Sequence, residues 1–518
     1  MPDLRLAVVA GATQIAAVIL DPRGQLIARA TVPTSRNEDE RRGILAAVRA
    51  VVAQRNGDPL PVRAVTVGLA TALSDALAPH RATRVAVIRI GRPLTCAVPP
   101  LATWPDHVRR AVSAGEVIVG GGVEYDGAVA VPLDAEATTR FLAGVAADAE
   151  AIAIAGVFST ASAEQELELA DVVRRELGAA VPVTLSHEIG TPGLLERENA
   201  TVLNAALLAA VDEFATAMQE TLAGLGIDAE MAFTANDGTV MALDHALRFP
   251  VRMIGGAVAS GICGAAFLSG VDDAVVLQVG GSSTDLGVLA SGFPRESSQP
   301  TVFAGIRTSV RMPRIRSLPF GGGSVLHLAG TQPRIGTANV ASDLAVHAWV
   351  FGGATPTLTD AAVAGGRATI GSRELAAWQK HRLRPVLDIV DDAVLQVVED
   401  AETTGPEPPL IVIGEAGFLV PERLSGVRDV IRPIHADVAP AIGAATAQVS
   451  GQAEQICANR TAARRTAHAE ARTAAFARAT AAGADPAGLA LVDVEEVPFA
   501  HVVSPAVRIR VKVRGPRA

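Results

Sequence analysis

The sequence predicts an α/β protein built from two related lobes, and three observations carry this prediction. Strand-like and helix-like segments alternate through residues 1–185, which is typical of a layered α/β structure. Residues 9–18 and 278–287 share a strand–loop–strand pattern about 270 residues apart, which indicates a repeated unit. The 518 residues are 49% hydrophobic and 19% charged, so the chain has enough apolar material for several cores and too little charge for a disordered protein.

The opening segment predicts three successive strands. Its apolar run is divided by two turn sequences, Gly11-Ala12-Thr13 and Asp21-Pro22-Arg23-Gly24. Thr13 and Gln14 interrupt the run, so strands joined by a tight loop explain it better than a signal peptide does. A helix over residues 41–54 follows, then further strands and helices, ending with a strand near residue 185.

The rest of the chain predicts a helical region, a second β-rich region and a β tail. Helix dominates from Leu194 to Leu222, strands begin again at Ala274, and a helical stretch over 375–400 precedes a strand that starts near Pro409. The uncharged stretch 253–271 contains too many glycines and serines for a membrane span. The expected units are residues 1–185, 186–451, an Ala- and Arg-rich helix at 452–482 that is exposed on one side, and a C-terminal β segment at 483–518.

Composition excludes several function classes. A net charge of -9 argues against nucleic-acid binding. Lys380 and Lys512 are the chain's two lysines, so Schiff-base chemistry has few candidates. The three cysteines are far apart, which predicts free thiols in a reducing cytoplasm, and no histidine pattern indicates a structural zinc site.

The hexapeptide at residues 280–285 is the segment most suggestive of ligand binding. Gly280 and Gly281 let backbone N–H groups approach an anion, and the hydroxyls of Ser282, Ser283 and Thr284 add donors. Asp285 follows where a carboxylate could hold Mg²⁺ or orient a water molecule. The alternative is a hairpin turn that is simply rich in small residues.

Three other loops share this character. Gly11 and Thr13 occupy the loop of the first strand pair, at the place that Gly280–Asp285 occupies in the second. The glycine triplet Gly321, Gly322 and Gly323 suits a ligand-facing loop or a plain flexible turn. The segment IVIGEAGFLVP at 411–421 runs a buried strand into a turn with Gly414 and Gly417, which suits a nucleotide-base shelf or ordinary strand–helix packing.

Two polar pairs follow apolar segments. His187-Glu188 comes after VPVTLS and Asn236-Asp237 after MAFTA, so both are expected at strand ends that face a cleft. The alternative for His187 is a helix cap or a loop contact. The consecutive helical residues Glu196, Arg197 and Glu198 point in different directions and are expected to be structural.

The order of these loops resembles the two-lobed nucleotide fold of actin, Hsp70 and sugar kinases, which is ribonuclease H-like. More specifically, nearly the whole chain resembles the hydantoinase A, 5-oxoprolinase and acetone carboxylase β-subunit family, in its short form without a fused hydantoinase B region. The segments that carry the resemblance are GVEYDG (122–127), GVFSTASAEQELELADVVRRELG (156–178), SHEIGTPGLLERENATVLNAAL (186–207), NDGTVM (236–241), GAAFLSGVDDAVVLQVGGSSTDLGVLASGFPRESS (264–298) and HADVAPAIGAATAQVSG (435–451).

The resemblance implies a cytoplasmic hydrolase subunit that uses ATP and Mg²⁺ to activate the carbonyl of a cyclic amide such as a hydantoin, lactam or oxoproline. It also implies an oligomer, with a hydantoinase B-like or other partner subunit. The implied site residues fall into three groups. Asp285 is implied as metal ligand and catalytic residue, with His187, Glu188 and Asp237 as further catalytic residues, and Asn236 as a substrate contact. The residues implied to bind the nucleotide are Gly11, Thr13, Gly280, Gly281, Ser282, Ser283, Thr284, Gly321, Gly322, Gly323, Gly414 and Gly417.

The chain departs from the family pattern at its acidic positions. The first hairpin of the family reads Asp-x-Gly-Gly-Thr-x-Thr-Asp, whereas here Val9 and Ala16 stand at the two acidic positions. Gln278 replaces the leading Asp of the second hairpin, and Glu415 enters the turn at 414–417. These changes predict little or no nucleotide hydrolysis, because carboxylates are the usual Mg²⁺ ligands. They also keep an alternative open: a catalytically degenerate binding or scaffold subunit of a larger complex.

Overall fold

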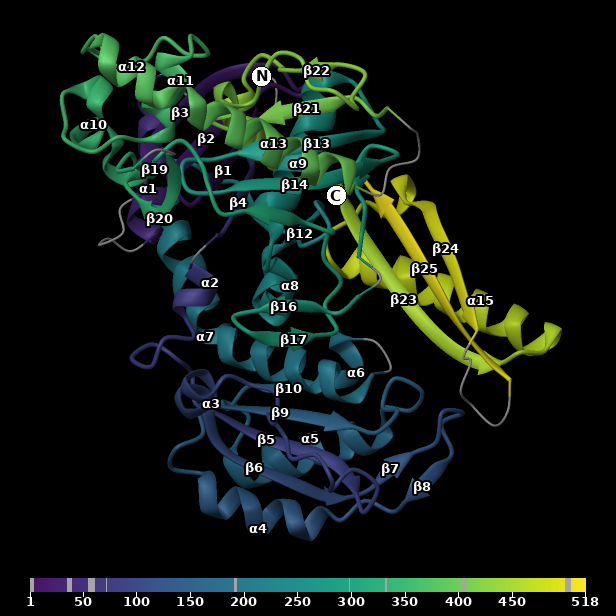
Figure 1. Cartoon of the computed structure of the whole chain (residues 1–518). Coiled ribbons are helices and arrows are strands. Elements are labelled where there is room, and N and C mark those ends of the chain that lie inside the picture. Colours follow the sequence, from purple (N-terminus) through teal and green to yellow (C-terminus); the bar gives the residue numbers. More distant parts are fainter. Residues whose placement is uncertain are drawn as a thin grey trace.

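The computed structural model describes residues 4–34, 40–54, 61–70, 72–190, 193–297, 299–330, 333–401, 407–498 and 505–518. Two lobes form the upper part of the molecule in Figure 1, a separate α/β unit lies below them, and a C-terminal arm projects to the side. The polar loops described above lie where these parts meet.

The first lobe is built on strands from distant parts of the chain. β1 (Leu4–Ala10), β2 (Gln14–Leu20) and β3 (Leu26–Pro33) pair antiparallel, and β4 (Val62–Gly68) and β11 (Glu230–Thr234) extend the sheet in parallel. The order is therefore β3-β2-β1-β4-β11. β12 (Val240–Ala242), β23 (Val449–Ala458), β25 (Ala506–Gly515) and β24 (Ala490–Pro498) continue it, and α1 (Glu40–Ala53) packs against β2 and β3.

The second lobe repeats this arrangement. β13 (Ala274–Val279) and β14 (Thr284–Ala290) form the hairpin, and β21 (Leu410–Ile413) and β22 (Val430–Ile431) follow in parallel. The order β14-β13-β21-β22 corresponds to β2-β1-β4-β11 of the first lobe, with β15 (Phe293–Pro294) and β18 (Arg316–Leu318) paired to β14. The repeated hairpin predicted from the sequence is thus confirmed as the opening of two equivalent sheets.

Two helices join the lobes. α14 (Ala439–Thr446) packs on β1 and β2, and α9 (Gly256–Ser269) packs on β13 and against α14. A Cβ atom on Gly264 would lie 1.9 Å from the carbonyl oxygen of Ala439, and one on Gly443 would lie 1.9 Å from that of Ser260. Glycine is therefore required on both helices for the two backbones to come this close.

The lower α/β unit has a sheet of its own. β5 (Val85–Arg92), β6 (Ser113–Gly120), β9 (Ala151–Gly156) and β10 (Val183–Leu185) run parallel in the order β10-β9-β5-β6, with α4 (Ala135–Val145) and α5 (Glu164–Leu177) packed on it. The expected unit 1–185 therefore contains two structures, because its first four strands belong to the sheet of the first lobe, where β4 pairs with β11, instead of to this sheet.

The long helix α7 (Leu194–Gly224) lies between the lower unit and the first lobe (Figure 1). Among the described helices it is the one long and apolar enough to cross a membrane, and 61% of its most apolar window is buried inside the molecule. Its apolar side chains belong to the main hydrophobic core. Arg197 and Glu198 are buried on it, and Glu198 pairs with Arg89 of β5, which confirms their expected structural role.

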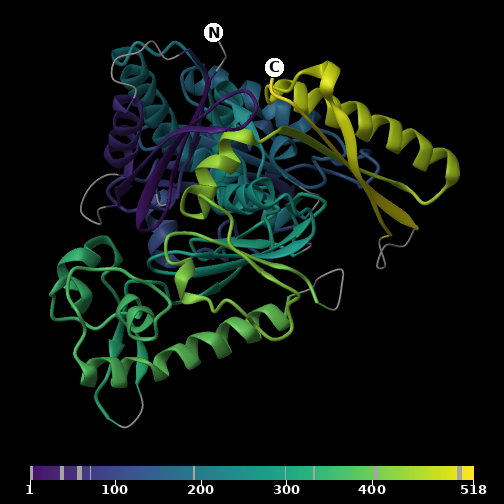
Figure 2. The ribbon, with the colours of Figure 1, turned by 90° about the horizontal axis from the view of Figure 1, so that it is seen from above.

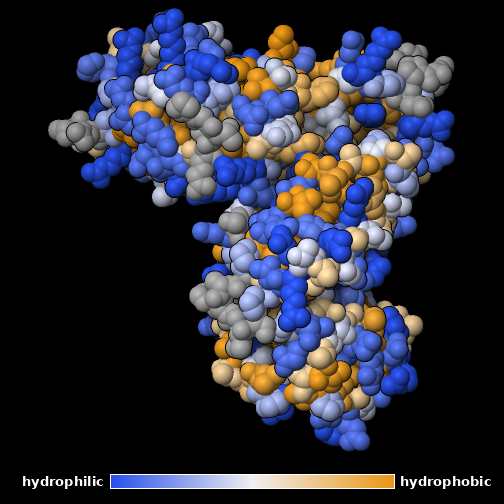
Figure 3. Space-filling model, turned by 90° about the vertical axis from the view of Figure 1, so that its right-hand side faces the viewer, coloured by the Kyte–Doolittle hydropathy of each residue, from blue (hydrophilic) through white to orange (hydrophobic). Residues whose placement is uncertain are grey.

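The helix expected at 452–482 begins later, at Thr461, as α15 (Thr461–Ala481). Residues 449–458 form β23 instead, because they pair with the whole length of β25. α15 buries Ala467, Ala471, Ala475 and Ala479 on one face, which confirms the one-sided exposure. β23, β25, β24 and α15 form the arm that extends away from both lobes in Figure 2. Figure 3 looks onto this side of the molecule and shows an apolar patch on a largely hydrophilic face.

The stretch between β15 and β21, here named the insertion, contains the β pairs β16 (Thr301–Phe303) with β17 (Ile306–Thr308) and β19 (Ser324–His327) with β20 (Arg334–Asn339), followed by α11 (Leu358–Ala364). The insertion lies partly outside the second lobe, because its β17 packs on α7 (Figure 1). The single helical stretch expected over 375–400 is two helices, α12 (Ala377–Leu383) and α13 (Pro385–Glu399). Pro385 at the first position of α13 explains the break, since proline starts helices readily and cannot continue one.

Candidate functional site

Two cavities gather most of the residues singled out from the sequence. The first lies between the two hairpin loops and is here named the loop cleft. The second, named the polar pocket, is lined by the lower unit, the first lobe, the insertion and the arm. Their linings differ in charge and in hydrogen-bonding groups.

The loop cleft has a volume of about 170 Å³ and confirms that the two hairpins face each other. The sequence-predicted residues that line it are Gly11, Thr13, Gly280, Ser282, Ser283, Asp285 and Gly414. Gly414 has φ +94°, and a Cβ there would lie 2.3 Å from the carbonyl oxygen of Val279, so the turn that follows β21 requires glycine.

The glycine triplet supports the loop from behind and does not line the cleft. The N–H groups of Gly322 and Gly323 donate to the carbonyl oxygens of Gly280 and Gly281, at 3.0 and 2.8 Å. Thr284 and Gly417 also lie outside the lining, and the Thr284 hydroxyl donates to the carbonyl of Phe320 at 2.8 Å. The triplet, Thr284 and Gly417 therefore shape the site without facing a ligand.

The carboxylate of Glu415 accepts hydrogen bonds from both hairpin loops. The N–H of Gly281 donates to its Oε1 at 2.8 Å, and the hydroxyl of Thr13 makes a very short hydrogen bond to the same oxygen. The side-chain amide of Gln14 lies 3.5 Å from Oε2. A carboxylate of the chain thus lies where these loops, with their backbone N–H and hydroxyl groups, would meet an anion.

Asp285 lies in the cleft and forms no ion pair with a described residue. Burial raises the pKa of its carboxyl, although hydrogen bonds from Ser317 and Ser283 act in the opposite direction. The hydroxyl of Ser283 donates to Oδ2 at 3.2 Å and that of Ser317 to Oδ1 at 2.5 Å. A raised pKa and two hydroxyl donors show a carboxylate held by neutral groups.

The lining of the cleft does not fit a magnesium nucleotide. Val9, Ala16 and Gln278 face it at the positions where the family pattern has carboxylates. The lining contains Asp285, Glu415 and Asp437 and no lysine or arginine, and of these Asp437 is paired with Arg29 at 2.8 Å. Within the described residues, no group of three or more His, Cys, Asp or Glu side chains could hold a metal ion. Triphosphate charge would therefore meet negative charge here with little to neutralise it.

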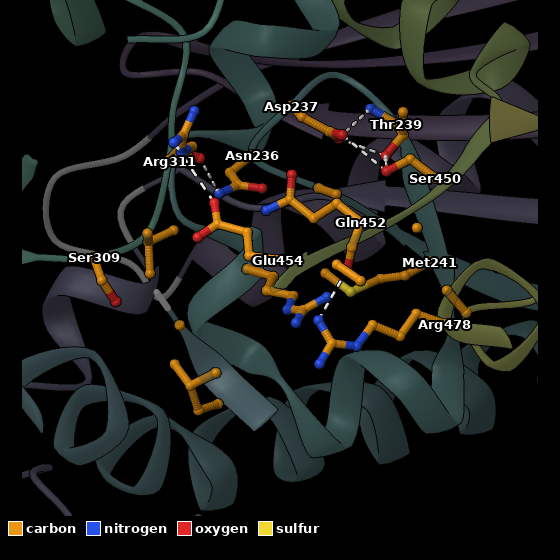
Figure 4. Close-up of a pocket in the computed structure, with 18 of the residues that line it drawn as sticks. Asn236, Asp237, Thr239, Met241, Ser309, Arg311, Ser450, Gln452, Glu454 and Arg478 are labelled. Carbon is orange, nitrogen blue, oxygen red and sulfur yellow. Dashed lines mark hydrogen bonds and ion pairs between the residues drawn. The ribbon is translucent and has the colours of Figure 1, made fainter. Parts of the chain in front are cut away.

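The polar pocket has a volume of about 110 Å³ and takes residues from four parts of the molecule: the lower unit, the first lobe, the insertion and the arm. His187, Asn236 and Asp237 line it as the sequence predicted. No sequence pattern pointed to its other ionisable and amide groups, which are His245, Arg252, Glu296, Arg311, Gln452, Glu454 and Arg478. In Figure 4 the side chains of Asn236, Gln452 and Glu454 gather at the centre, with Arg311 on one side and Arg478 on the other.

His187 is held by a buried glutamate. It lies on α6 (Ser186–Ile189), at the end of β10, and its Nδ1 is 2.7 Å from Oε2 of Glu166 on α5. Glu166 also accepts from the N–H of Gly156 at 2.8 Å and the hydroxyl of Ser186 at 2.6 Å. Burial works against its charged form, but the hydrogen bonds from His187 and Ser186 lower the pKa of Glu166 below its usual value. The glutamate thus orients the ring, and Nε2 is the nitrogen left for the pocket.

Glu188, the neighbour of His187, does not join the pocket. Its carboxylate makes a very short ion pair with Arg248, and its carbonyl oxygen accepts from Arg252 at 3.1 Å. Asn236 lines the pocket, but its amide nitrogen donates to the carbonyl oxygen of Arg311 at 2.5 Å. The expectation that both polar pairs face one cleft holds for three of the four residues.

Asp237 is fixed in a buried network and is not free to act as a base. Its carboxylate accepts from the N–H of Thr239 at 3.0 Å and the hydroxyl of Ser450 at 2.8 Å, and it pairs with Lys512 at 2.7 Å. Burial alone would raise its pKa, but Lys512 and Arg514 hold that pKa well below the usual range. Lys512 also pairs with Glu296, so the network ties the arm to the second lobe.

Three charged groups of the pocket make few direct contacts with opposite charges among the residues that the structure describes. Among the described residues, neither carboxylate oxygen of Glu454 has a hydrogen-bond partner, and its nearest cation is Arg311 at 3.6 Å. Arg478 donates to the carbonyl oxygen of Gln452 at 2.9 Å, and Arg252 to that of Glu188. Burial, and to a lesser extent the neighbouring Arg478, lowers the pKa of Arg252 to about 10. Burial and nearby arginines likewise lower the pKa of His245 to about 3, which keeps that imidazole neutral.

Comparisons with known proteins agree on one family. Residues 5–177 match the hydantoinase/oxoprolinase N-terminal region, and residues 197–384 match the hydantoinase/oxoprolinase family. The chain is 27% identical over 273 residues to the caprolactamase subunit alpha of Pseudomonas jessenii, covering 51% of this chain and 37% of that protein. It is 26% identical over 253 residues to the acetophenone carboxylase gamma subunit of Aromatoleum aromaticum, covering 46% of this chain and 34% of that protein. The match thus spans little more than a third of each relative.

Solved structures give the same fold at low identity. The ATP-dependent caprolactamase of Pseudomonas jessenii superposes with a TM-score of 0.77 at 17% identity, covering 99% of this chain and 87% of that chain. Nucleotide-free acetone carboxylase superposes with a TM-score of 0.68 at 15% identity, covering 100% and 88%. The two repeated sheets, the paired hairpin loops and the two family matches together show that the chain belongs to the hydantoinase/oxoprolinase family and has its two-lobed, actin-like fold.

Proposed function

We propose that this chain is a hydrolase subunit that binds a cyclic amide in the polar pocket and uses His187 as the general base. The observation that carries the proposal is the contact of His187 Nδ1 with buried Glu166, which leaves Nε2 for a pocket lined by amide and charged groups. A histidine oriented in this way is the usual general base near neutral pH.

The proposed reaction opens the ring by attack of water. His187 removes a proton from the water, the water oxygen bonds to the carbonyl carbon, and the carbon–nitrogen bond breaks. The proton then passes from the imidazolium to the departing nitrogen, so the histidine returns to its starting state. Arg252 and Arg478 supply positive charge for the oxygen of the intermediate, and Glu454 supplies an acceptor for a ring N–H. A hydantoin, lactam or oxoproline has these groups.

ATP has no step in this reaction. The solved caprolactamase relative is ATP-dependent, and the family resemblance implies ATP and Mg²⁺ for this chain. The lining of the loop cleft, with Glu415 on its donors and apolar side chains at the carboxylate positions, argues against that use here.

The working unit is proposed to be a cytoplasmic oligomer with a hydantoinase B-like or other partner subunit. Two relatives are named as subunits, and this chain matches only about a third of each. Three free cysteines support a reducing compartment, and the net charge of -9 supports a partner other than nucleic acid.

The test is the rate of ring opening of hydantoin, 2-pyrrolidone and 5-oxoproline, measured by mass spectrometry with the purified chain and with the chain bound to its partner subunit. His187→Gln should lower the rate about 100-fold or more, because a general base contributes roughly that factor. The matched control is His327→Gln, an exposed histidine outside the pocket lining, which should leave the rate unchanged. Equal rates in the parent and His187→Gln would contradict the proposal.

A second candidate is the scaffold subunit, and the position of Glu415 favours it. A carboxylate on the loop donors is compatible with a fold kept for assembly after nucleotide chemistry was lost. This candidate predicts no ring opening by any preparation, together with a stable complex between the chain and its partner.

A further inference from the structure

The two hairpin loops of the fold are joined by a side chain. Thr13 belongs to the loop between β1 and β2 in the first lobe, and Gly281 to the equivalent loop between β13 and β14 in the second. Both donate to Oε1 of Glu415, which comes from the turn after β21. One oxygen therefore connects the two lobes at the mouth of the loop cleft.

The surrounding backbone places this carboxylate with little freedom. The backbone of Gly414 is in the left-handed conformation, which sets the direction of the turn. The N–H of Ala416 donates to the carbonyl oxygen of Val279 at 3.0 Å and so ties the turn to the end of β13. The N–H of Gly281 points at Glu415 because its loop is closed by a hydrogen bond from Gly280 to Ser283 at 2.9 Å. The glycine triplet then supports the loop from behind.

The donors are those of an anion site. Backbone N–H groups in glycine loops, with an added hydroxyl, bind phosphate oxygens and carboxylates alike. Hydrogen bonds to an ionised acceptor are stronger than those between neutral groups. The cleft lining offers no lysine or arginine that would favour a second anion beside Glu415.

We propose that Glu415 is a built-in anion that takes the place of a nucleotide phosphate between the two hairpin loops. It bridges the lobes without ATP, and it excludes phosphate and nucleotide from the loop cleft. Removing its carboxylate uncovers a site for a phosphate group, either free or at the end of a nucleotide. This inference concerns the loop cleft and stands independently of the reaction proposed for the polar pocket.

Calorimetric titration with inorganic phosphate and, separately, with Mg-ATP tests the proposal. Glu415→Ala should bind phosphate at least about tenfold more tightly than the parent, because the loop donors become free and one negative charge is lost. Glu415→Gln keeps the volume of the side chain and should show a smaller gain in the same direction. A gain with Mg-ATP that exceeds the gain with phosphate would show that the rest of the cleft still receives a nucleotide.

The control is Glu422→Ala, which removes an exposed carboxylate beyond the same turn and should not change phosphate binding. Circular dichroism and the urea unfolding midpoint show whether each variant is folded. Phosphate or Mg-ATP binding by the parent as tight as that by Glu415→Ala would overturn the proposal. So would the absence of binding in both folded Glu415 variants, because the loops would then not form an anion site.

Discussion

Burial sets the behaviour of single charged residues in this protein. Asp237 and Glu166 are carboxylates whose pKa is lowered despite their burial, at Asp237 by the charges of Lys512 and Arg514 and at Glu166 by the hydrogen bond from His187. Burial raises the pKa of Asp285, whose hydrogen bonds within the described residues come from hydroxyl groups. The difference follows from the partners, since a nearby cation stabilises the charged form and burial without one destabilises it. Residue type and spacing in the sequence carry no information about those partners.

His245 makes stability depend on pH. Its pKa of about 3 in the folded protein lies below the ordinary 6.5. As pH falls through 6.5, the imidazole therefore binds a proton in the unfolded chain and stays neutral in the folded chain. The free energy of unfolding should therefore drop between pH 7 and pH 5, by up to about 2 kcal/mol from this residue. Urea unfolding at the two pH values measures the drop. It should be smaller by that amount in His245→Gln, and an equal drop in both proteins would refute the assignment.

The buried pair of Arg89 and Glu198 gives a second prediction. Their side chains are 0% and 1% exposed, and the pair ties β5 of the lower unit to α7. Glu198→Gln leaves the guanidinium buried without its counter-charge, which should lower the free energy of unfolding by about 3–5 kcal/mol. Glu136→Gln, which removes the 91% exposed partner of Arg140, is the control and should have no measurable effect. Similar unfolding midpoints for the two variants would contradict the structural role.

At the scale of elements, strongly patterned segments were predictable and long-range pairing was not. The first three strands and both hairpins follow from apolar runs broken by turn residues. The start of α15 was misplaced because residues 452–458 are compatible with a helix and become a strand only by pairing with β25. The glycine triplet was assigned to ligand binding, whereas its backbone supports the neighbouring loop: Gly322 and Gly323 donate to that loop, and a Cβ on Gly321 would meet its backbone.

The contact between α9 and α14 gives the prediction at this scale. Gly443→Ala places a methyl group against the backbone of Ser260, where neither helix can yield without moving a lobe. The free energy of unfolding should fall by about 3 kcal/mol or more, which is at the upper end of the destabilisation that overpacked sites show. Gly144→Ala on α4 is the matched control, since a Cβ there meets nothing within 4 Å. It should leave stability unchanged or raise it by up to about 1 kcal/mol, as alanine favours a helix.

At the scale of the whole molecule, the candidate site depends on how separate parts are brought together. His187, Asn236 and Asp237 were found from the sequence because each follows an apolar strand, but Glu166, Arg252, Glu454 and Arg478 follow no such pattern. The polar pocket draws on the lower unit, the first lobe, the insertion and the arm, whose mutual positions are fixed by contacts distant in sequence. Local patterns predicted the fold, and only the assembled structure shows the pocket.

In the proposed function, the chemistry takes place in the polar pocket and the loop cleft does not turn over ATP. The most direct test is the rate of ring opening with and without Mg-ATP, measured for the parent and for Asp285→Ala, which removes the surviving carboxylate of the hairpin motif. We expect the same rate in all four measurements and no release of inorganic phosphate from ATP. Ring opening that requires Mg-ATP, accompanied by phosphate release and lost in Asp285→Ala, would contradict it.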